Sequence, residues 1–317
     1  MDDASRDPQP PSGAQWTIAA GGHEAVVVEV GGGLRAYRVN GVDYLDGYDE
    51  SELCVGGAGQ VLAPWPNRIR DGRYTFAGTT YQLPLTEAAS HTAMHGLVNW
   101  SPWRLASHAA DSVTVRCDLP AQPGYPWSLS MRTRWQVGSD GLRVRHEATN
   151  RGRTEAPFGL AAHPYVRLPG VPVDEVTLRV PGRSRLLVDG RQLPLGAAKV
   201  DGGEYDFTAP RRIGATVLDT TFGDLDGDAD GGSAVTLSAP DGSVAVTVWA
   251  GPRFRWWQVF TADTLGGDRR RRSVAVEPMT CPPDAFRSGL DLIGLAPGQT
   301  WSGEWGIHPS AAPPSPI

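Results

Sequence analysis

The sequence predicts an all-β protein, and three observations lead to that prediction. Short runs in which apolar and polar residues alternate, the pattern of a strand with one buried face, recur along the chain. No segment keeps the 3.6-residue apolar period of a helix over three turns. The 39 glycines and 27 prolines fall between the runs, as turn residues do. Strands without covering helices must bury their apolar faces against another sheet, so we expect a large antiparallel sandwich.

Taken in order, the first elements are two predicted hairpins. Residues 25–30 and 34–39 alternate on either side of Gly31–Gly33, which gives a strand, a turn and a strand. Residues 72–83 repeat this pattern around the turn Ala77–Gly78. Further alternating runs are predicted as strands at 112–117, 127–137, 142–148, 176–180, 234–238, 244–249, 256–260, 273–277 and 300–307.

Length and charge limit the classes of protein to consider. With 317 residues the chain can bury a large core, and we expect one domain over residues 15–309 between disordered tails at 1–14 and 310–317. The formal charge of -6 and a pI near 5.6 argue against DNA or RNA as a partner. We expect a monomer or a homodimer that binds a small molecule.

The compartment predicted from the sequence is the cytoplasm. The first residues lack the apolar region of a secretory signal, and no apolar run approaches membrane-spanning length. Cys54, Cys117 and Cys281 are odd in number and widely spaced, which fits neither a disulfide framework nor a structural zinc site. A reducing compartment without a membrane partner is therefore expected.

Two candidate acid/base groups share one sequence context. The apolar stretch 157–168 is predicted as a strand that presents His163 and stops at Pro164, and the run from Val274 ends in Glu277 followed by Pro278. A desolvated carboxylate can act as a base near neutral pH, opposite an imidazole that acts as an acid. The alternatives are a core histidine bonded to a backbone carbonyl and an edge glutamate paired with an arginine.

A third candidate is His95, which is followed by Gly96. The glycine permits a tight backbone and suggests close approach to a ligand. His91 lies four residues earlier, a spacing that can hold a metal on a helix. Here the context is a loop without an HExxH motif or a nearby carboxylate, so no metal site is expected.

A braced loop and two strands supply candidate sugar ligands. Two prolines enclose Trp65, and the loop then presents Asn67 and Arg68, a combination suited to hydroxyl groups and to the C–H face of a pyranose. The alternative is a core tryptophan and a surface ion pair. Asp219 and Gln258 are further candidate hydroxyl ligands, although a turn aspartate and a strand glutamine would look the same.

Two charged loops are not expected to belong to the site. Residues 223–232 resemble a calcium loop but lack its terminal glutamate and flanking helices, so a solvated acidic turn is expected. Residues 266–272, with four arginines, are expected to be a solvated loop, or else to steer an anionic substrate.

The order of these motifs resembles the aldose 1-epimerase (galactose mutarotase) family. The resemblance runs from about Trp16 to Ile307 and rests on Asn67-Arg68-Ile69, the 74–83 hairpin, His95-Gly96, Gly124-Tyr-Pro126, His163-Pro164-Tyr165, residues 219–222 and Val276-Glu-Pro-Met-Thr280. It implies a galactose mutarotase-like β-supersandwich with an open sugar cleft, a monosaccharide substrate and no cofactor.

The resemblance also implies roles for the candidate residues. His163 would protonate the ring oxygen while Glu277 removes the proton of the anomeric hydroxyl, so that the ring opens and recloses as the other anomer. His95 and Arg68 would hold the ring, and Asp219 and Gln258 would bind hydroxyls; Asn67, Trp65 and Tyr165 complete the predicted binding residues.

The expected activity is therefore interconversion of the α and β anomers of a free hexose. Ala162, Arg167 and Thr92 stand where sugar-specific galactose mutarotases usually carry asparagine, and the Pro-Trp-Pro-Asn-Arg-Ile form resembles other mutarotases, including a sulfosugar-acting subgroup. The alternatives are a non-catalytic carbohydrate-binding sandwich and an epimerase for a hexose 6-phosphate or sulfosugar.

Overall fold

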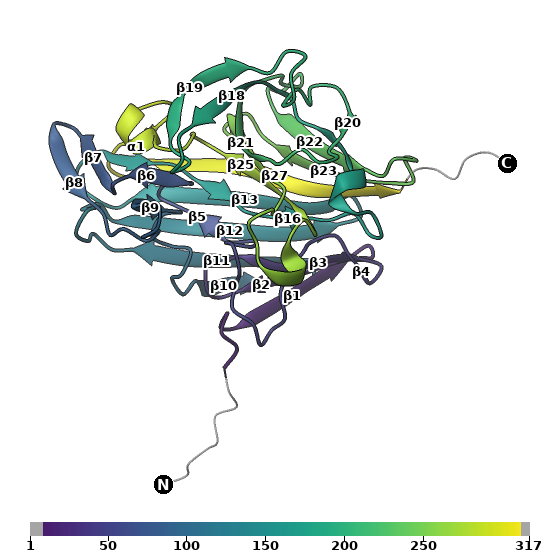
Figure 1. Ribbon diagram of the computed structural model, residues 1–317. Helices are drawn as coiled ribbons and strands as arrows, with labels where there is room; N and C mark the ends of the chain where they lie inside the picture. The colour runs from purple at the N-terminus through teal and green to yellow at the C-terminus, as the bar shows by residue number, and fades with distance from the viewer. Residues whose placement is uncertain (1–8, 312–317) are drawn as a thin grey trace, which may run out of the picture.

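The computed structural model describes residues 9–311, and antiparallel strands dominate it (Figure 1). Its largest sheet has nine strands. In spatial order they are β10 (Arg104–His108), β11 (Ser112–Leu119), β12 (Leu129–Gly138), β13 (Gly141–Asn150), β27 (Thr300–Ala311), β23 (Val244–Ala250), β22 (Ser233–Ser238), β17 (Thr177–Arg179) and β20 (Arg211–Arg212). The prediction of an all-β antiparallel protein is confirmed.

A second large sheet has eight strands. Its spatial order is β19 (Pro194–Lys199), β18 (Gly182–Val188), β21 (Asp219–Leu225), β24 (Trp256–Phe260), β25 (Val274–Met279), β15 (Ala161–Ala162) and β5 (Val61–Leu62), with β16 (Tyr165–Val166) paired to β25 beyond the end of β15. This sheet carries most of the residues that matter below.

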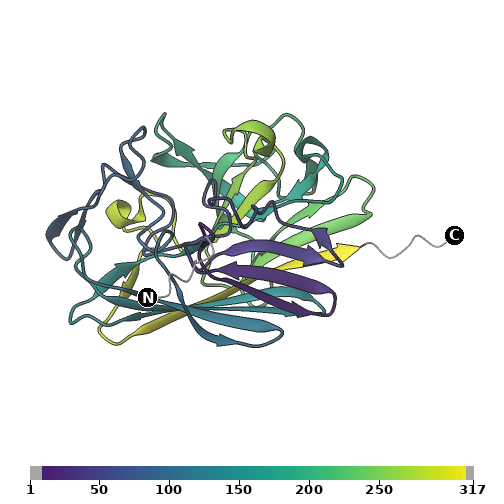
Figure 2. The same ribbon diagram turned by 90° about the horizontal axis from the view of Figure 1, so that it is seen from below.

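Smaller elements complete the fold. The four-stranded sheet β1 (Gln15–Ala20), β2 (His23–Val28), β3 (Leu34–Val39) and β4 (Val42–Asp43) packs beside β11 and β12, as Figure 2 also shows. The two-stranded sheets are β6 (Arg68–Arg70) with β9 (Thr92–Met94), β7 (Arg73–Phe76) with β8 (Thr79–Gln82), and β14 (Ala156–Phe158) with β26 (Ile293–Leu295). The helices are η1 (Val173–Glu175), η2 (Gly267–Arg269) and α1 (Ala285–Ser288). Within residues 9–311, none is long and apolar enough to cross a membrane.

The main hydrophobic core lies between the two large sheets. On β25, Val274 and Val276 belong to this core, together with Trp257 and Val259 of β24 and Trp135 of β12. Because successive side chains of a strand point to opposite faces, the intervening residues of β24 and β25 point to the outer face of the eight-stranded sheet. Strand alternation therefore separates a face that builds the sandwich from a face that can build a site.

Two details of the predicted strands are corrected. Residues 157–168 do not form one strand but contribute to β14, β15 and β16. The breaks fall near Gly159, where a Cβ would come within 2.5 Å of Cys281 Sγ, and at Pro164, which has no N–H for the ladder. Glu277 does not end its strand, because β25 continues to Met279.

The predicted tails are also shorter than expected where the structure describes them. Residues 1–8 and 312–317 lie outside the described part of the chain. Ser12 is buried, and its carbonyl accepts a hydrogen bond from the N–H of Val30. At the other end, β27 includes Ser310 and Ala311, which were predicted to belong to the C-terminal tail.

The arginine-rich loop is tied down by carboxylates rather than solvated throughout. Arg271 lies within 2.8 Å of both Asp174 and Asp263, and Arg272 contacts Asp46 at 2.6 Å and Asp268 at 3.0 Å. Like-charged neighbours in sequence can pack closely here because each one has its own acidic partner, which the sequence pattern does not show. The interpretation of this loop as solvated is therefore wrong for these arginines.

Candidate active site

The candidate site is a row of side chains that crosses the outer face of the eight-stranded sheet. The register pairs Thr221 with Gln258 and Gln258 with Glu277. Tyr165 pairs with Ala275 and Ala161 with Met279, so His163, midway between them, stands opposite Glu277. Residues opposite one another in an antiparallel pair share a face and come within contact distance. Three strands and the connection between β15 and β16 thus bring together side chains that are far apart in the sequence.

His163 and Glu277 form the centre of this row. His163 Nε2 lies 3.4 Å from Glu277 Oε1, and the two residues are 5% and 3% exposed. Both line a cavity of about 360 Å³. His163 Nδ1 and Glu277 Oε2 are buried and have no hydrogen-bond partner among residues 9–311. Buried polar atoms are almost always paired, so a pair of titratable groups with unfilled capacity in a cavity indicates a site for a ligand.

Burial shifts the pKa of both groups toward the neutral form. It lowers the pKa of His163 to about 4. It raises the pKa of Glu277 well above its usual range, a shift that Asp219 increases and Arg68 opposes. Since the two groups are in contact, they titrate as a coupled pair, in which the protonation of each group depends on that of the other. Two such groups in contact can supply an acid and a base.

His95 is held beside this pair by an unusual backbone. Its ring lies edge-on to that of His163 with centroids 5.5 Å apart, and desolvation lowers its pKa well below the usual value. His95 has a φ of 62°, and its N–H donates to the carbonyl of Asn67, whose φ is 51°. Its Nδ1 is buried without a partner among the described residues. Asn67 therefore positions His95 through its main chain.

Gly96 serves a different purpose from the one predicted, and the neighbouring His91 lies away from the site. A Cβ on Gly96 would overlap the carbonyl oxygen of Ala63, so Gly96 allows close packing of two backbones rather than approach to a ligand. His91 lies outside the cavity and contacts Asp71 at 3.0 Å. The two histidines four residues apart therefore do not share a site.

Arg68 enters the cavity with a carboxylate partner. Its Nε and Nη2 donate to the two oxygens of Glu87 at 2.7 and 2.8 Å. The hydroxyl of Thr92 donates to Glu87 Oε2 at 2.7 Å and fixes the carboxylate. This paired geometry is the strongest that arginine forms, and it orients the guanidinium that acts on the pKa of Glu277.

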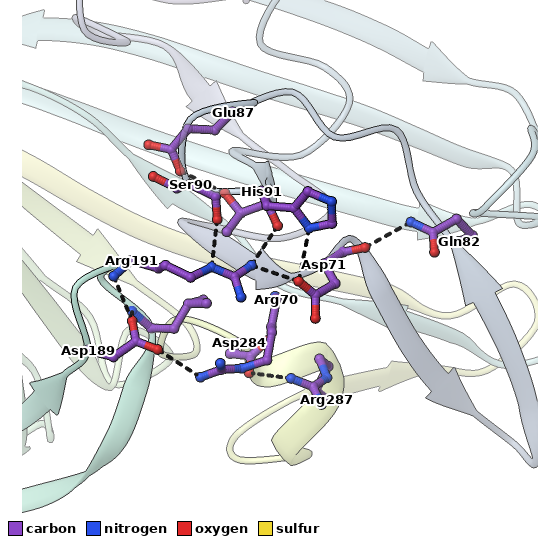
Figure 3. Close-up of polar contacts among 12 residues, drawn as sticks. Arg70, Asp71, Gln82, Glu87, Ser90, His91, Asp189, Arg191, Asp284 and Arg287 are labelled. Carbon is purple, nitrogen blue, oxygen red and sulfur yellow. Dashed lines mark hydrogen bonds and ion pairs between the residues drawn. The ribbon is translucent and has the colours of Figure 1, made fainter.

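The loop that carries Glu87 is anchored from another hairpin. Arg191, in the turn between β18 and β19, donates to the carbonyls of Ser90 and His91 at 2.8 Å and to Asp71 at 2.7 Å. Figure 3 shows the guanidinium of Arg191 between these groups, of which Ser90 and His91 belong to the same loop as Glu87. The turn itself is fixed because Asp189 accepts from the N–H of Arg191 at 2.8 Å. This network restrains the loop without entering the cavity.

Asp219 and Gln258 close the other end of the site. Gln258 Nε2 donates to Asp219 Oδ1 at 2.6 Å, and the hydroxyl of Thr221 donates to Gln258 Oε1. Both atoms of the Gln258 amide are thus occupied, and the remaining oxygen of Asp219 is the group suited to a ligand. Desolvation raises the pKa of Asp219, and the charge of Arg68 opposes that shift.

The two predicted aromatic ligands differ in position. Tyr165 lines the cavity and stacks on His163 with ring centroids 4.9 Å apart, while its hydroxyl donates to the carbonyl of Gly56. Trp65 does not line the cavity. Its indole is buried in the core against Phe286 and donates to the carbonyl of Ala93. The structure therefore corrects the prediction for Trp65, because its bracing prolines direct the ring inward.

Sequence reasoning missed several cavity residues, among them Gln60, Glu87, Asn99 and Trp100. Glu87 lies in a polar loop and has no motif around it. Trp100 could have been noticed, because a tryptophan five residues after a candidate histidine, in a turn with Asn99 and Ser101, is an unusual apolar residue for a loop. Gln60 could be found only from its register against His163.

Fold and site together define a class of protein. It is a β-sandwich protein with an acidic and a basic side chain in contact on the outer face of one sheet, inside a cavity lined mainly by polar and aromatic groups. A cavity of this size, with a few convergent polar groups, is typical of a small-molecule site.

Comparison with known proteins assigns the family. The family model for aldose 1-epimerase matches residues 14–308, and the chain belongs to that family. A relative from Escherichia coli K12, described as uncharacterized protein YihR, is 35% identical over 91% of each chain. Galactose mutarotase of Rattus norvegicus is 27% identical over 56% of this chain and 52% of its own. The family is one of carbohydrate epimerases, and that general activity is the one supported for this chain.

Solved structures support the fold. The GalM/aldose epimerase homologue from C. elegans has a TM-score of 0.85 at 19% identity, covering 95% of this chain and 99% of its own. Galactose 1-epimerase from Lactobacillus acidophilus has a TM-score of 0.77 at 18% identity over 92% of each chain. The galactose mutarotase-like fold predicted from the sequence is confirmed.

Proposed function

We propose that this protein is an aldose 1-epimerase that interconverts the α and β anomers of a free hexose by acid/base catalysis. The observation that carries the proposal is the contact between His163 and Glu277 in the cavity, 3.4 Å apart, each with a buried atom that lacks a partner among the described residues. Family membership supports the same chemistry.

In the proposed reaction, the pair acts as an imidazolium and a carboxylate, the form in which each charge stabilises the other against burial. Glu277 accepts the proton of the anomeric hydroxyl while His163 donates a proton to the ring oxygen. The bond between C1 and the ring oxygen breaks, and C1 becomes an aldehyde carbon. Rotation about the C1–C2 bond presents the other face of the aldehyde, and the reverse proton transfers close the ring. The pair gains and loses one proton in each half-reaction, so it returns to its starting state.

The other polar groups hold the sugar during these steps. We infer that Asp219 accepts a hydrogen bond from a hydroxyl near C2, because it is bonded to Gln258, which stands next to Glu277 on the side away from His163. Arg68, oriented by Glu87, stabilises negative charge that develops at the anomeric oxygen. A positioned acid and base each contribute roughly 10²- to 10⁴-fold, which is enough for a reaction that also occurs unaided.

Exchange between anomers, measured by NMR or polarimetry, tests the proposal. Fresh α-D-glucose and α-D-galactose should reach equilibrium faster with the protein than in buffer alone. A rate equal to that of buffer with both sugars and with α-sulfoquinovose would refute the assignment. Hexose 6-phosphates are expected to be poorer substrates, because Arg68, which Glu87 already pairs, is the one lysine or arginine among the cavity residues of the described chain.

A further inference from the structure

Gln60 extends the catalytic row by one more strand. The register pairs Ala162 with Val61 and Ala161 with Leu62, so continuing it by one residue places Gln60 opposite His163. The N–H of Gly59 donates to the carbonyl of His163 at 2.8 Å, which holds the two segments together at this point. Gln60 lines the same cavity, on the opposite side of His163 from Glu277.

Of the two polar atoms in the Gln60 side-chain amide, one is hydrogen-bonded and the other has no partner among the described residues. Its Nε2 donates to the carbonyl of Asn99 at 2.6 Å, which fixes the orientation of the amide. Its Oε1 has no partner among residues 9–311. This oxygen is buried, and the whole residue is only 2% exposed, so water cannot easily replace the missing partner. A buried carbonyl oxygen without a donor is rare in native proteins. A ligand that brings a hydroxyl donor to this position would complete the pairing.

Trp100 stands beside this amide and remains exposed. Its side chain is 56% exposed although it lines the cavity, and Gln60 binds the residue that precedes it. The turn is rigid, because the hydroxyl of Ser101 donates to the carbonyl of Leu97 and the N–H of Gly31 donates to the carbonyl of Ser101. An indole held in place at a sugar cavity offers an apolar surface to the C–H groups of the ligand.

The order of side chains in the row matches the order of atoms in an aldopyranose. If Glu277 contacts the anomeric hydroxyl and His163 the ring oxygen, the next atoms along the sugar are C5 and its exocyclic carbon. The next side chain along the row is Gln60, one strand further and thus about 4.8 Å away along the sheet. Asp219, which is bonded to Gln258, lies on the other side of Glu277, the side assigned to C2.

We propose that Gln60 and Trp100 form a specificity subsite for the exocyclic hydroxymethyl group of an aldohexose. Gln60 Oε1 accepts a hydrogen bond from the 6-hydroxyl, and the Trp100 indole packs against the C–H groups of C5 and C6. This inference rests on the proposed function, since it uses the assignment of Glu277 and His163 to the two oxygens.

The subsite favours an uncharged hydroxyl over an anionic group. An acceptor such as Gln60 Oε1 requires a donor, and an ionised phosphate or sulfonate offers none. The neighbours Gly57, Asn99 and Trp100 carry no charge that would compensate an anion.

Pairs of sugars that differ only in the exocyclic group provide the test. D-glucose is compared with D-xylose, and D-galactose with L-arabinose, by anomer exchange and by calorimetric binding. Gln60→Met keeps the volume and removes the acceptor. It should lower kcat/KM for each hexose about tenfold, the effect of one lost hydrogen bond, and change kcat/KM for each pentose little.

Trp100 gives a second variant that does not depend on the buried amide, because its side chain is exposed. Trp100→Ala should raise KM for the hexoses more than for the pentoses and leave kcat nearly unchanged, whereas Trp100→Phe should restore most of the loss. Leu195→Ala, at a side chain 69% exposed on β19 outside the cavity, is the matched control and should change neither constant.

The outcomes separate this inference from the proposed function. If the unmodified protein accelerates anomer exchange for none of the sugars, the proposed function is refuted. Calorimetric binding of the hexoses and pentoses then still tests the subsite. Equal losses for hexose and pentose in both Gln60→Met and Trp100→Ala, or tighter binding of glucose 6-phosphate than of glucose, overturn the subsite.

Discussion

Two buried histidines of this protein show what distinguishes a core residue from a reactive one. His146 on β13 is 0% exposed, and burial lowers its pKa to about 3. His163 is also buried, and the same cause lowers its pKa to about 4. By burial and by pKa alone the two residues are alike.

Their hydrogen bonds differ. His146 Nδ1 is bonded to the hydroxyl of Thr133 and its Nε2 accepts from the indole of Trp305, both at 2.8 Å, so the ring is satisfied by the core. His163 Nδ1 has no partner within residues 9–311, and its ring meets Glu277 in a cavity. The comparison teaches that a perturbed pKa indicates a functional group only when it comes with unfilled hydrogen-bonding capacity and space for a ligand.

The largest expected effect is the loss of catalysis at the unsatisfied pair. Glu277→Gln removes the base while keeping the shape of the side chain, so kcat should fall by roughly 10²- to 10⁴-fold. His163→Asn should have a similar effect. Anomer exchange followed by NMR measures both, with circular dichroism to confirm folding. Retention of more than a tenth of the original kcat in Glu277→Gln would contradict the assigned role.

The satisfied histidine should show the opposite pattern. His146→Phe leaves the Trp305 indole N–H and the Thr133 hydroxyl without their partner, and the free energy of unfolding should fall by about 2–3 kcal/mol. The kcat of the folded fraction should be unchanged, because His146 lies outside the cavity. Urea denaturation and anomer exchange on the same sample test this. A loss of kcat without a loss of stability in His146→Phe would contradict the assignment of His146 as a purely structural histidine.

The pH dependence of stability sharpens the contrast. A pKa of Glu277 raised in the folded protein means that its contribution to stability is complete below the unfolded pKa, near 4.5, and is lost as pH rises through the folded pKa. Glu277→Gln removes this titration. Relative to the unmodified protein, the variant should therefore gain stability as pH rises, by at most about 1.4 kcal/mol per pH unit.

A series from pH 4.5 to 9 covers the titration of Glu277, whose pKa is raised from 4.5. The pKa values of His146 and His163 are lowered from 6.5, so their own contributions change only below about pH 6.5. Urea denaturation at several pH values in this range measures the difference. A difference in stability between variant and unmodified protein that stays constant from pH 4.5 to 9 would show that the carboxyl group does not titrate as proposed.

The smallest effect is expected at the carboxylate that orients Arg68. Glu87→Gln removes the charge that balances Arg68, so the arginine should stabilise the ionised form of Glu277 more strongly. The acid limb of the profile of kcat/KM against pH should then move to lower pH by a few tenths of a unit. Glu24→Gln, at an exposed ion pair with Arg38, is the control and should leave the profile unchanged. A profile that keeps its position in Glu87→Gln would reduce the role of Glu87 to packing.

The strands were predicted well where one face meets solvent and less well where both faces are covered. Alternation located β12, β13 and β22 to within two residues at either end, and the β7–β8 hairpin was found from its Ala77–Gly78 turn. The break between β14 and β15 was missed because residues 157–168 are apolar without a period. Such a run does not show which side chains share a face.

The site was predicted in part, for the same reason. His163, Glu277, His95, Arg68 and Asp219 were named from local context and motif order, and the structure brings them to one cavity. Trp65 was misplaced because a tryptophan between prolines fits a core and a sugar site equally well. Glu87 and Gln60 were missed because their importance comes from partners 19 and about 100 residues away in the chain.

The sequence by itself determined the class of fold and the chemical identity of the reactive groups, because alternation and side-chain chemistry are local properties of the chain. Only the tertiary structure decided that Gln258, Glu277, His163 and Gln60 stand in one row, and that His163 rather than His146 keeps an unpaired nitrogen. Register between distant strands decides both, and register is set by how two whole sheets pack rather than by any short stretch of sequence.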